Sequence, residues 1–377
     1  MSALAGVRVV EFADGWSGAA IAGRLLAELG ATVIKVEPPE GDSLRRRPPL
    51  SEKTSLAFDL LAAGKASVVL DFLREQDARN YALDIAATCD VVIDGLRDGV
   101  LSEAGLGANA IRGRRADVIW CDVTTFGRES TMAGVPGGDL VAQAMSGFMT
   151  ITGFADAPPT SAGIPLSEHA AGVFAVTGIL AALLHRDATS EGQDVDIASV
   201  DCLTYFLSSF LPAVFLERSV PGRQGFRHPL MAPWDAYDAD GGKVVICTGS
   251  ESHWRAMLRM MGRDDLVECE RYATAERRVA YVDEVNGIIE GWIARLAPAE
   301  AVAMLHSIGV PAGPILQLDQ VFADPQFQAR ELALAVEGDG HRAVTPGSVY
   351  KMSATPGRVA HPAPLLECGA RMSELGV

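Results

Sequence analysis

The chain has 377 residues, 49% hydrophobic and 21% charged, which is enough to bury one large core or one large and one small core. Its formal net charge of -16 argues against a nucleic-acid partner, because nucleic acids bind to basic surfaces. An anionic small ligand remains compatible with this charge, since a few local Arg or Lys side chains suffice to bind one.

The six cysteines are scattered, without a C-x-x-C pair and without histidines at metal-ligand spacing. This usage is typical of reduced thiols in a cytoplasmic protein, so we expect neither a metal site nor a disulfide framework. The most apolar stretch, residues 170–184, is too short to span a bilayer, so we expect a buried helix and no membrane partner. The N-terminal residues show no pattern of a secretion signal.

The first 125 residues alternate short β-branched runs with helical stretches. Strands are expected at residues 7–12, 32–36, 67–70, 90–94 and 117–121. With a helix at residues 17–29 between the first two, this alternation predicts a parallel, doubly wound sheet. The segment Ala13-Asp-Gly-Trp-Ser-Gly18 follows the first strand and lacks the G-x-G-x-x-G fingerprint, which argues against a dinucleotide-dependent dehydrogenase.

The composition changes after the middle of the chain. Long apolar helices are expected from residue 139 to about 216, and a segment rich in Arg, Gly and Pro follows at residues 217–233. Such a change indicates a domain boundary. Residues 234–312 combine a strand at 243–248 with several helical stretches, which predicts a smaller α+β unit. Turns around residues 309–314 predict the return of the chain to the first domain.

The most informative motif is Pro136-Gly-Gly-Asp-Leu-Val-Ala-Gln-Ala-Met-Ser-Gly147, which places Asp139 after a glycine pair and at the start of an apolar helix. An aspartate there can be a helix N-cap, whose carboxylate accepts hydrogen bonds from the first turn. It can also be a nucleophile that attacks an activated acyl group and carries it covalently. Taken alone, the motif favours the cap.

Segments along nearly the whole chain carry a family resemblance through their order and spacing. They lie at residues 6–11, 25–39, 64–71, 136–147, 178–184, 192–197, 309–314 and 353–358. On these segments the chain resembles the family III CoA-transferases, the group that includes formyl-CoA and carnitine CoA-transferases and the related α-methylacyl-CoA racemases. Any one segment is weak evidence, whereas the ordered set is specific.

The resemblance implies an α/β fold and an interlocked homodimer. Each chain would have a large Rossmann-like, CoA-binding domain with a parallel sheet, formed by residues 1–219 and 313–377, and a small α+β domain at residues 220–312. The implied activity moves CoA from an acyl-CoA donor to a small free carboxylic acid. Coenzyme A and acyl-CoA would then be substrates, and no permanently bound cofactor is expected.

The resemblance also implies roles for individual residues. Asp139 would be the nucleophile that forms an aspartyl-CoA intermediate, which reverses the preference for a cap. Lys65, Arg97 and the cluster Arg45-Arg46-Arg47 are candidate donors to the CoA phosphates, although the cluster is more typical of a solvated loop. Gly225 would belong to a glycine loop over the acyl site. The other expected CoA contacts are Trp16, Ser17, Leu96, Thr124, Phe126 and Gly127.

Some residues depart from the family pattern, and two alternatives stay open. Gly95-Leu96 stands where many relatives have Asn-Phe, Glu103 replaces a basic residue, and Trp16 replaces a smaller or polar side chain beside the acyl group. The first alternative is an α-methylacyl-CoA racemase. Gly138 stands where racemases carry a histidine, although acidic residues align at Glu168 and Glu251 and His169 is a possible substitute. The second is a non-catalytic partner subunit of a hetero-oligomeric transferase.

Overall fold

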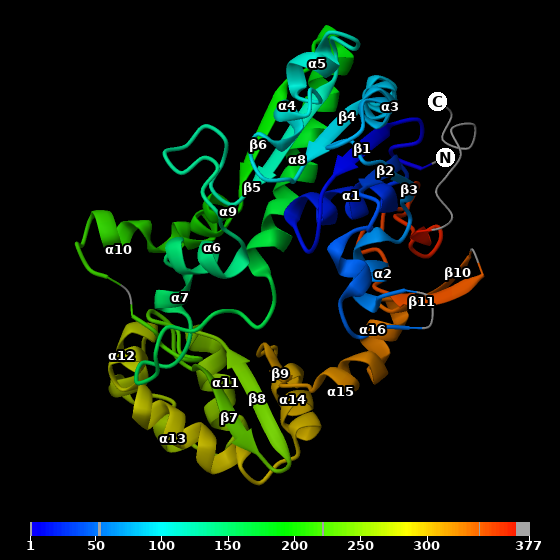
Figure 1. The fold of residues 1–377 in the computed structure, drawn as a ribbon. Helices are drawn as coiled ribbons and strands as arrows, with labels where there is room; N and C mark the ends of the chain where they lie inside the picture. The colour runs from blue at the N-terminus through cyan, green and yellow to red at the C-terminus, as the bar shows by residue number, and fades with distance from the viewer. Residues whose placement is uncertain (1, 52–53, 221, 339, 367–377) are drawn as a thin grey trace. The chain divides into compact units, whose positions relative to one another are not determined.

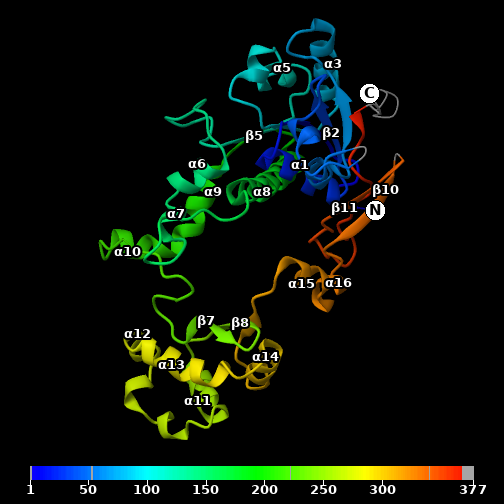
Figure 2. The same ribbon diagram turned by 60° about the horizontal axis from the view of Figure 1, so that its bottom comes forward.

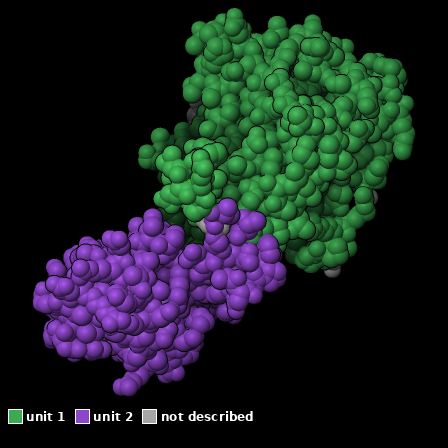
Figure 3. Space-filling view, turned by 90° about the vertical axis from the view of Figure 1, so that its left-hand side faces the viewer, with its two compact units in different colours: residues 1–149, 161–219, 324–377 green, residues 150–160, 220–323 purple. Residues whose placement is uncertain are grey.

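The computed structural model describes residues 2–51, 54–220, 222–338 and 340–366. The chain forms two compact units, shown in Figures 1 and 3. Unit 1 contains residues 1–149, 161–219 and 324–377, and unit 2 contains residues 150–160 and 220–323.

The limits of these units differ from the expected domains in two segments. Residues 150–160 belong to unit 2, where the Gly225 N–H donates to the carbonyl oxygen of Gly153. Residues 313–323 also belong to unit 2, because the strand β9 (Ala312–Pro314) pairs with the sheet of that unit. Both differences come from hydrogen bonds between segments that are distant in sequence.

Unit 1 is built on a six-stranded parallel sheet with the order β3-β2-β1-β4-β5-β6 (Figure 1). The five expected strands all form. The sixth strand was not expected, because the exposed Asp194 and Asp196 interrupt its apolar pattern at the sheet edge. The strands are β1 (Arg8–Phe12), β2 (Thr32–Glu37), β3 (Ala66–Val69), β4 (Val91–Asp94), β5 (Ile119–Thr124) and β6 (Asp194–Ala198).

Helices cover both faces of this sheet. On β1, Val9 faces a core formed with α1, α2 and α8, whereas Val10 faces a second core formed with α3, α4 and α5. This alternation is the side-chain period of a strand that is buried on both faces, as in doubly wound folds. The helices are α1 (Gly18–Glu28), α2 (Leu56–Ala62), α3 (Gln76–Ala87), α4 (Val100–Glu103), α5 (Ala108–Arg112) and α8 (Leu166–Thr189).

The remaining elements of unit 1 lie at its borders. Two 3-10 turns, η1 (Ser43–Arg46) and η2 (Leu207–Phe210), accompany short helices. A two-stranded antiparallel hairpin is formed by β10 (Leu334–Gly338) and β11 (His341–Thr345). The short helices are α6 (Asp139–Met145), α9 (Ser199–Phe206), α10 (Leu211–Phe215) and α16 (Pro325–Ala329), and α7 (Phe148–Ile151) begins in unit 1 and ends in unit 2.

The long helix α8 is the expected apolar helix, and it extends beyond residues 170–184 at both ends. By length and composition it could cross a membrane, and half of its most apolar window is buried inside the structure. It packs closely on α1, because a Cβ at Gly18 would lie 2.8 Å from Ala171 Cβ and one at Gly172 would lie 2.5 Å from Ile21 Cγ2. This close packing against the sheet layer is that of a core helix.

Unit 2 is an α+β unit with a three-stranded antiparallel sheet of order β7-β8-β9. Helices α13 and α14 pack on this sheet (Figure 2), and Tyr237, Trp254 and Ile289 are among the residues of the shared core. The other strands are β7 (Trp234–Ala239) and β8 (Gly242–Cys247). The helices are α11 (Glu251–Met260), α12 (Ala275–Ala280), α13 (Val282–Ile293), α14 (Pro298–Ser307) and α15 (Leu318–Ala323), with 3-10 turns at Asp264–Leu266 and Glu270–Tyr272.

A buried arginine holds the loops of unit 2 together. Arg278 has no exposed surface, and its guanidinium donates to three carbonyl oxygens: Ala232 O at 2.7 Å, Tyr272 O at 3.0 Å and Gly249 O at 2.6 Å. Each buried carbonyl that loses its donor costs about 1–3 kcal/mol.

We therefore predict that Arg278→Met destabilises unit 2 by about 3 kcal/mol, because the substitution leaves these carbonyl oxygens unpaired. Urea denaturation followed by tryptophan fluorescence measures the loss, because Trp234, Trp254 and Trp292 all lie in unit 2. The neighbouring Arg277 is exposed, so Arg277→Met serves as the control and should change the stability by about 0.5 kcal/mol or less. Equal losses in the two variants would contradict the assigned role of Arg278.

Candidate active site

A cleft of about 370 Å³ lies where β1, β4 and β5 end in unit 1. In the sheet, β2 and β3 follow on one side of β1, and β4, β5 and β6 follow on its other side. The strand order therefore reverses between β1 and β4. Ligands of open α/β sheets bind at this point, outside the carboxyl ends of the strands. Most of the expected CoA contacts line the cleft: Ser17, Leu96, Arg97, Thr124, Phe126 and Gly127.

Three of the expected CoA contacts do not line this cleft. Trp16 packs against the core, with its ring centroid 5.9 Å from that of His169. Gly225 belongs to unit 2 and has a left-handed backbone, with φ +64. Lys65 is buried, and its ammonium donates to Glu11 Oε2 at 2.6 Å and to Ala20 O at 2.8 Å. The Lys65 ammonium thus donates its hydrogen bonds to protein partners and does not line the cleft.

The arginine cluster at residues 45–47 is not simply a solvated loop. Arg45 forms two hydrogen bonds with the buried carboxylate of Glu37, and its guanidinium lies 3.8 Å from the ring centroid of Phe58. Burial raises the pKa of Glu37, but Arg45 and Ser67 outweigh it and hold the pKa below its usual value. Arg45 is therefore a structural ion-pair partner.

Asp139 is the first residue of α6, and its carboxylate is held by three donors. Oδ1 accepts hydrogen bonds from the backbone N–H and the hydroxyl of Ser167, both at 2.8 Å, and Oδ2 accepts one from Gln143 Nε2 at 2.7 Å. Ser167 belongs to the first turn of α8, so Asp139 caps α8 and not its own helix. Asp139 thus acts as a cap, but it caps α8 and not α6, the helix that its own motif begins.

The carboxylate of Glu168 lies in the wall of the cleft. Its Oε2 accepts a hydrogen bond of 2.7 Å from the N–H of Gly18, the first residue of α1. Among the described residues, no donor bonds to Oε1. Burial and the nearby charge of Asp139 raise the pKa of Glu168, although the Gly18 hydrogen bond opposes this. Glu168 thus presents one carboxylate oxygen that no described residue occupies, at the N-termini of two helices.

Arg128 lies in the cleft among three carboxylates, and it was not among the expected site residues. Its guanidinium pairs with Asp94, Asp98 and Asp122, which come from two different strand ends. Burial raises the pKa of Asp94 to about 6 and that of Asp122 to about 7, although Arg128 lowers both. In sequence, the only sign of this cluster is that charged residues follow β4 and β5.

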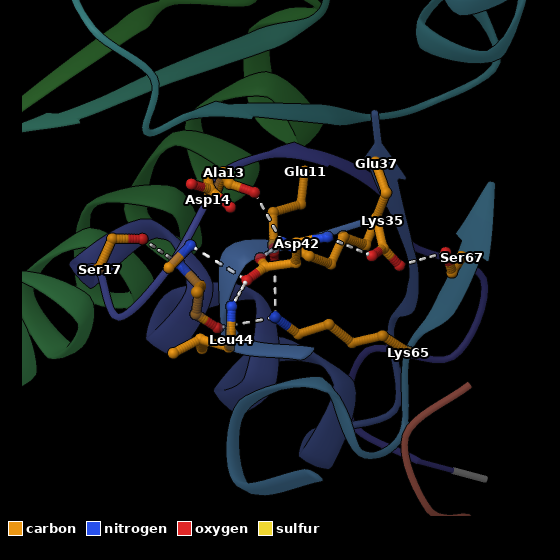
Figure 4. A network of polar contacts seen from close by, with 12 residues as sticks. Glu11, Ala13, Asp14, Ser17, Lys35, Glu37, Asp42, Leu44, Lys65 and Ser67 are labelled. Carbon is orange, nitrogen blue, oxygen red and sulfur yellow. Dashed lines mark hydrogen bonds and ion pairs between the residues drawn. The ribbon is translucent and has the colours of Figure 1, made fainter. Parts of the chain in front are cut away.

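A buried charged network fixes the β1–α1 loop, which carries Trp16 and Ser17 (Figure 4). Lys35 Nζ donates to Ala13 O at 2.7 Å and pairs with Asp42 at 2.8 Å. Asp42 Oδ1 in turn accepts the N–H of Gly15 at 3.2 Å. Burial opposes the charge on Lys35, but nearby acids raise its pKa above the usual value. The loop backbone is therefore positioned by side chains beneath it and not by glycine-rich turns.

Glu11 joins two lysines at the centre of this network. Its Oε1 accepts from Lys35 at 3.1 Å and its Oε2 accepts from Lys65 at 2.6 Å. Burial, only partly offset by Glu11, lowers the pKa of Lys65 to about 8. Gly23 of α1 leaves the space for the carboxylate, because a Cβ there would lie 1.9 Å from Glu11 Oε2.

We predict that Gly23→Ala lowers the free energy of unfolding by about 2 kcal/mol or more, because the methyl group displaces the buried Glu11 carboxylate from its lysines. This reverses the usual gain of about 1 kcal/mol when alanine replaces a glycine inside a helix. Gly287→Ala in α13 is the matched control, because a Cβ at Gly287 would have no described atom outside the helix within 4 Å. It should be stabilising. Urea denaturation of both variants checks the opposite signs, and stabilisation by both would refute the steric argument.

Fold and cleft together define an α/β protein with a candidate ligand cleft at the switch point of a parallel sheet, and Asp98 and Glu168 are the acidic residues of its lining. The chain belongs to CoA-transferase family III, whose family model matches residues 4–370. It is 33% identical over 373 residues to the succinate–glutarate CoA-transferase of Agrobacterium fabrum, covering 96% of this chain and 92% of that protein.

Two further comparisons agree with this assignment. The succinyl-CoA:mesaconate CoA-transferase of Haloarcula hispanica is 32% identical, over 97% of this chain and 94% of that protein. The crystal structure of a CAIB/BAIF family protein from Brucella suis matches with a TM-score of 0.88 and 31% identity, over 99% of each chain. The resemblance read from the sequence is therefore confirmed at the level of the family.

Proposed function

We propose that this protein transfers CoA from an acyl-CoA donor to a free carboxylic acid through a covalent intermediate on Glu168. The observation that carries the proposal is the Glu168 carboxylate in the cleft wall, with one oxygen held by Gly18 and the other without a described donor. Family membership supplies the reaction class. The names of the two relatives mention succinate, glutarate and mesaconate, which supports a dicarboxylic acid as one substrate.

The sequence resemblance assigned the nucleophile to Asp139, and this assignment stays a prediction. The geometry favours Glu168, because a nucleophilic oxygen needs a lone pair that is free to face the substrate. Oδ1 of Asp139 accepts two hydrogen bonds and Oδ2 accepts one, and Asp139 is not among the residues that line the cleft, whereas Glu168 is. We therefore propose that Asp139 positions the first turn of α8, which carries Glu168.

The first half-reaction begins when Glu168 Oε1 attacks the donor's thioester carbonyl. The C–S bond breaks, which gives a mixed anhydride and the CoA thiolate. The thiolate then attacks the glutamyl carbonyl, so a glutamyl-CoA thioester forms and the donor acid leaves as a carboxylate. Attack at Asp139 would give the aspartyl-CoA intermediate instead. Covalent half-steps of this kind divide one difficult transfer into easier ones.

The second half-reaction repeats these steps in reverse with the acceptor acid. The acceptor carboxylate attacks the glutamyl-CoA carbonyl, which gives a mixed anhydride and releases the thiolate. The thiolate attacks the acceptor's acyl carbonyl, and the product leaves as an acyl-CoA while Glu168 regains its carboxylate. One thioester is broken and one is formed, so no nucleoside triphosphate is consumed.

The structure offers a donor for the negative charge that develops on Glu168. When the thiolate attacks the glutamyl carbonyl, the Gly18 N–H is already hydrogen-bonded to Oε2. One such oxyanion donor is worth about 3–4 kcal/mol in enzymes that depend on it. The N-termini of α1 and α8 add partial positive charge on the same side.

Trapping with hydroxylamine identifies the nucleophile. We expect that protein incubated with succinyl-CoA or acetyl-CoA and then with hydroxylamine carries a hydroxamate on Glu168, found by peptide mass spectrometry. Glu168→Gln should abolish the label and lower kcat by at least about 10³-fold, as expected for a lost nucleophile. Asp139→Asn should keep the label and lower kcat by about 10²-fold through misplacement of Glu168.

Other outcomes of this trapping experiment select the alternatives. A hydroxamate on Asp139 that persists in Glu168→Gln would return the nucleophile to Asp139. If no label forms and a 2-methylacyl-CoA exchanges its α-proton in deuterated water, the protein is a racemase. In the structure His169 donates from Nδ1 to Pro165 O, and no observation favours it as a racemase base. If CoA does not bind at all, the protein is a non-catalytic partner subunit.

We also propose that the protein is a homodimer, interlocked as in its family, and located in the cytoplasm. Free thiols at the described cysteines support the location, and Cys368 lies outside the described residues. Large apolar side chains stand exposed on neighbouring helices of unit 1, and a second copy of the chain would cover them. They are Val173 and Leu184 of α8, Tyr205 and Phe206 of α9, and Leu211, Phe215 and Leu216 at α10.

We predict that the purified protein has twice the mass of one chain in light scattering. Phe215→Glu should shift it toward the monomer, because a buried charge at a dimer contact is unpaired. The matched control is Leu318→Glu, which changes a residue of similar exposure in unit 2 and should leave the mass unchanged. A monomeric wild type would contradict the homodimer.

A further inference from the structure

Arg128 is held in the cleft by partners that differ in burial. Its Nη2 pairs with Asp94 and its Nε lies 2.6 Å from Asp122 Oδ1, whereas its Nη1 donates to Asp98 Oδ1 at 3.0 Å. The side chains of Asp94 and Asp122 are 1% and 10% exposed, and that of Asp98 is 33% exposed. Two buried carboxylates thus anchor one edge of the guanidinium, and the third partner is the solvent-accessible one.

The backbone around Arg128 is fixed as well. The N–H of Arg128 donates to Asp196 Oδ2 at 2.9 Å, and that of Gly127 donates to Thr124 Oγ1 at 2.9 Å. Such anchoring preorganises the guanidinium, because neither its loop nor its inner edge has to be ordered when a ligand arrives. The Nη1 group and Asp98 remain at the cleft, which both residues line.

The acids around Arg128 reduce its attraction for an anion, so the case for anion binding rests on the geometry of the guanidinium. Burial raises the pKa of Asp94 to about 6 and that of Asp122 to about 7, so at neutral pH Asp94 is largely ionised and Asp122 carries only part of a negative charge. Asp98 contributes the accessible negative charge. Arg97, the other arginine of the cleft, lies 3.7 Å from Glu103 and is largely exposed. Arg128 is therefore the more rigid cation of the cleft.

From this geometry we infer that the Nη1 group of Arg128 binds a phosphoryl group of the acyl-CoA. Asp98 accepts the Nη1 hydrogen bond until the phosphoryl group displaces it. This inference rests on the proposed function. Arginine and phosphate form strong charge-assisted hydrogen bonds, and both the 3′-phosphate dianion and the doubly charged diphosphate of CoA compete well with a single, partly exposed carboxylate. CoA offers two sources of this chemistry, its diphosphate and its 3′-phosphate.

A double-mutant cycle on the full-length protein tests this inference, with CoA binding measured by calorimetry. We expect Arg128→Gln to weaken CoA binding about 10- to 100-fold, as for the loss of a charge-assisted contact. Asp98→Asn should tighten it several-fold in the wild type and change it by less than about twofold in the Arg128→Gln background. Arg128→Lys keeps a charge beside Asp94 and Asp122 and replaces the glutamine variant if that variant does not fold.

The result that overturns the inference is equal tightening by Asp98→Asn with and without Arg128, which would be a general charge effect. Unchanged CoA affinity in both Arg128 variants would overturn it too. Glu103→Gln removes a carboxylate near the cleft that does not touch Arg128, so its effect should be the same in both backgrounds.

Truncated ligands distinguish the two phosphoryl sources. If Arg128→Gln weakens CoA and dephospho-CoA equally, the diphosphate is bound; if it weakens only CoA, the 3′-phosphate is bound. Equal weakening of pantetheine, which has no phosphate, would contradict the inference. If the wild type binds no CoA, the proposed function is contradicted as well. If the wild type binds CoA and the Arg128 variants bind it with the same affinity, only this inference is contradicted.

Discussion

The site depends on the pairing of the buried Glu11 carboxylate with two lysine ammonium groups. The Glu11 carboxylate has no exposed surface and lies on β1, next to the point where the strand order reverses. An unpaired buried carboxylate is very costly, so Lys35 and Lys65 must approach it from β2 and from the start of β3. The same Lys35 holds the carbonyl of Ala13, which links the charge balance of the sheet to the loop at the cleft (Figure 4).

The second determinant of the site is the close contact of α1 and α8. Gly18 and Gly172 remove the side chains that would separate the two helices, so both N-termini meet at Glu168. Asp139 and Glu168 then lie near each other in different environments, one bonded by three donors and one bonded by a single backbone N–H. Neighbouring carboxylates in different environments can take different roles, as pairs of acidic residues do in many enzymes.

The proposed phosphoryl site of the cleft combines a cation with acidic neighbours. Asp94, Asp98 and Asp122 surround Arg128, which keeps the cation at a fixed position but also reduces its attraction for anions. Near neutral pH the elevated pKa of Asp122 lessens this conflict in part, whereas Asp94 stays largely ionised. Asp94 ends β4, Asp122 lies in β5 and Asp98 lies in the loop after β4, so neighbouring strands of the sheet bring these acids to Arg128.

The sequence by itself determined the α/β class, five of the six strands of the parallel sheet, the family and six of the residues that line the cleft. These features are local: strand periodicity spans a few residues, and loops that follow parallel strands converge at one edge. Only the tertiary structure decided which charges meet. It paired Lys65 with Glu11, Arg45 with Glu37 and Arg128 with three aspartates. It also placed the carboxylate of Asp139 against the first turn of α8 and Glu168 in the cleft wall, because partners in a folded chain are set by long-range packing that residue spacing does not encode.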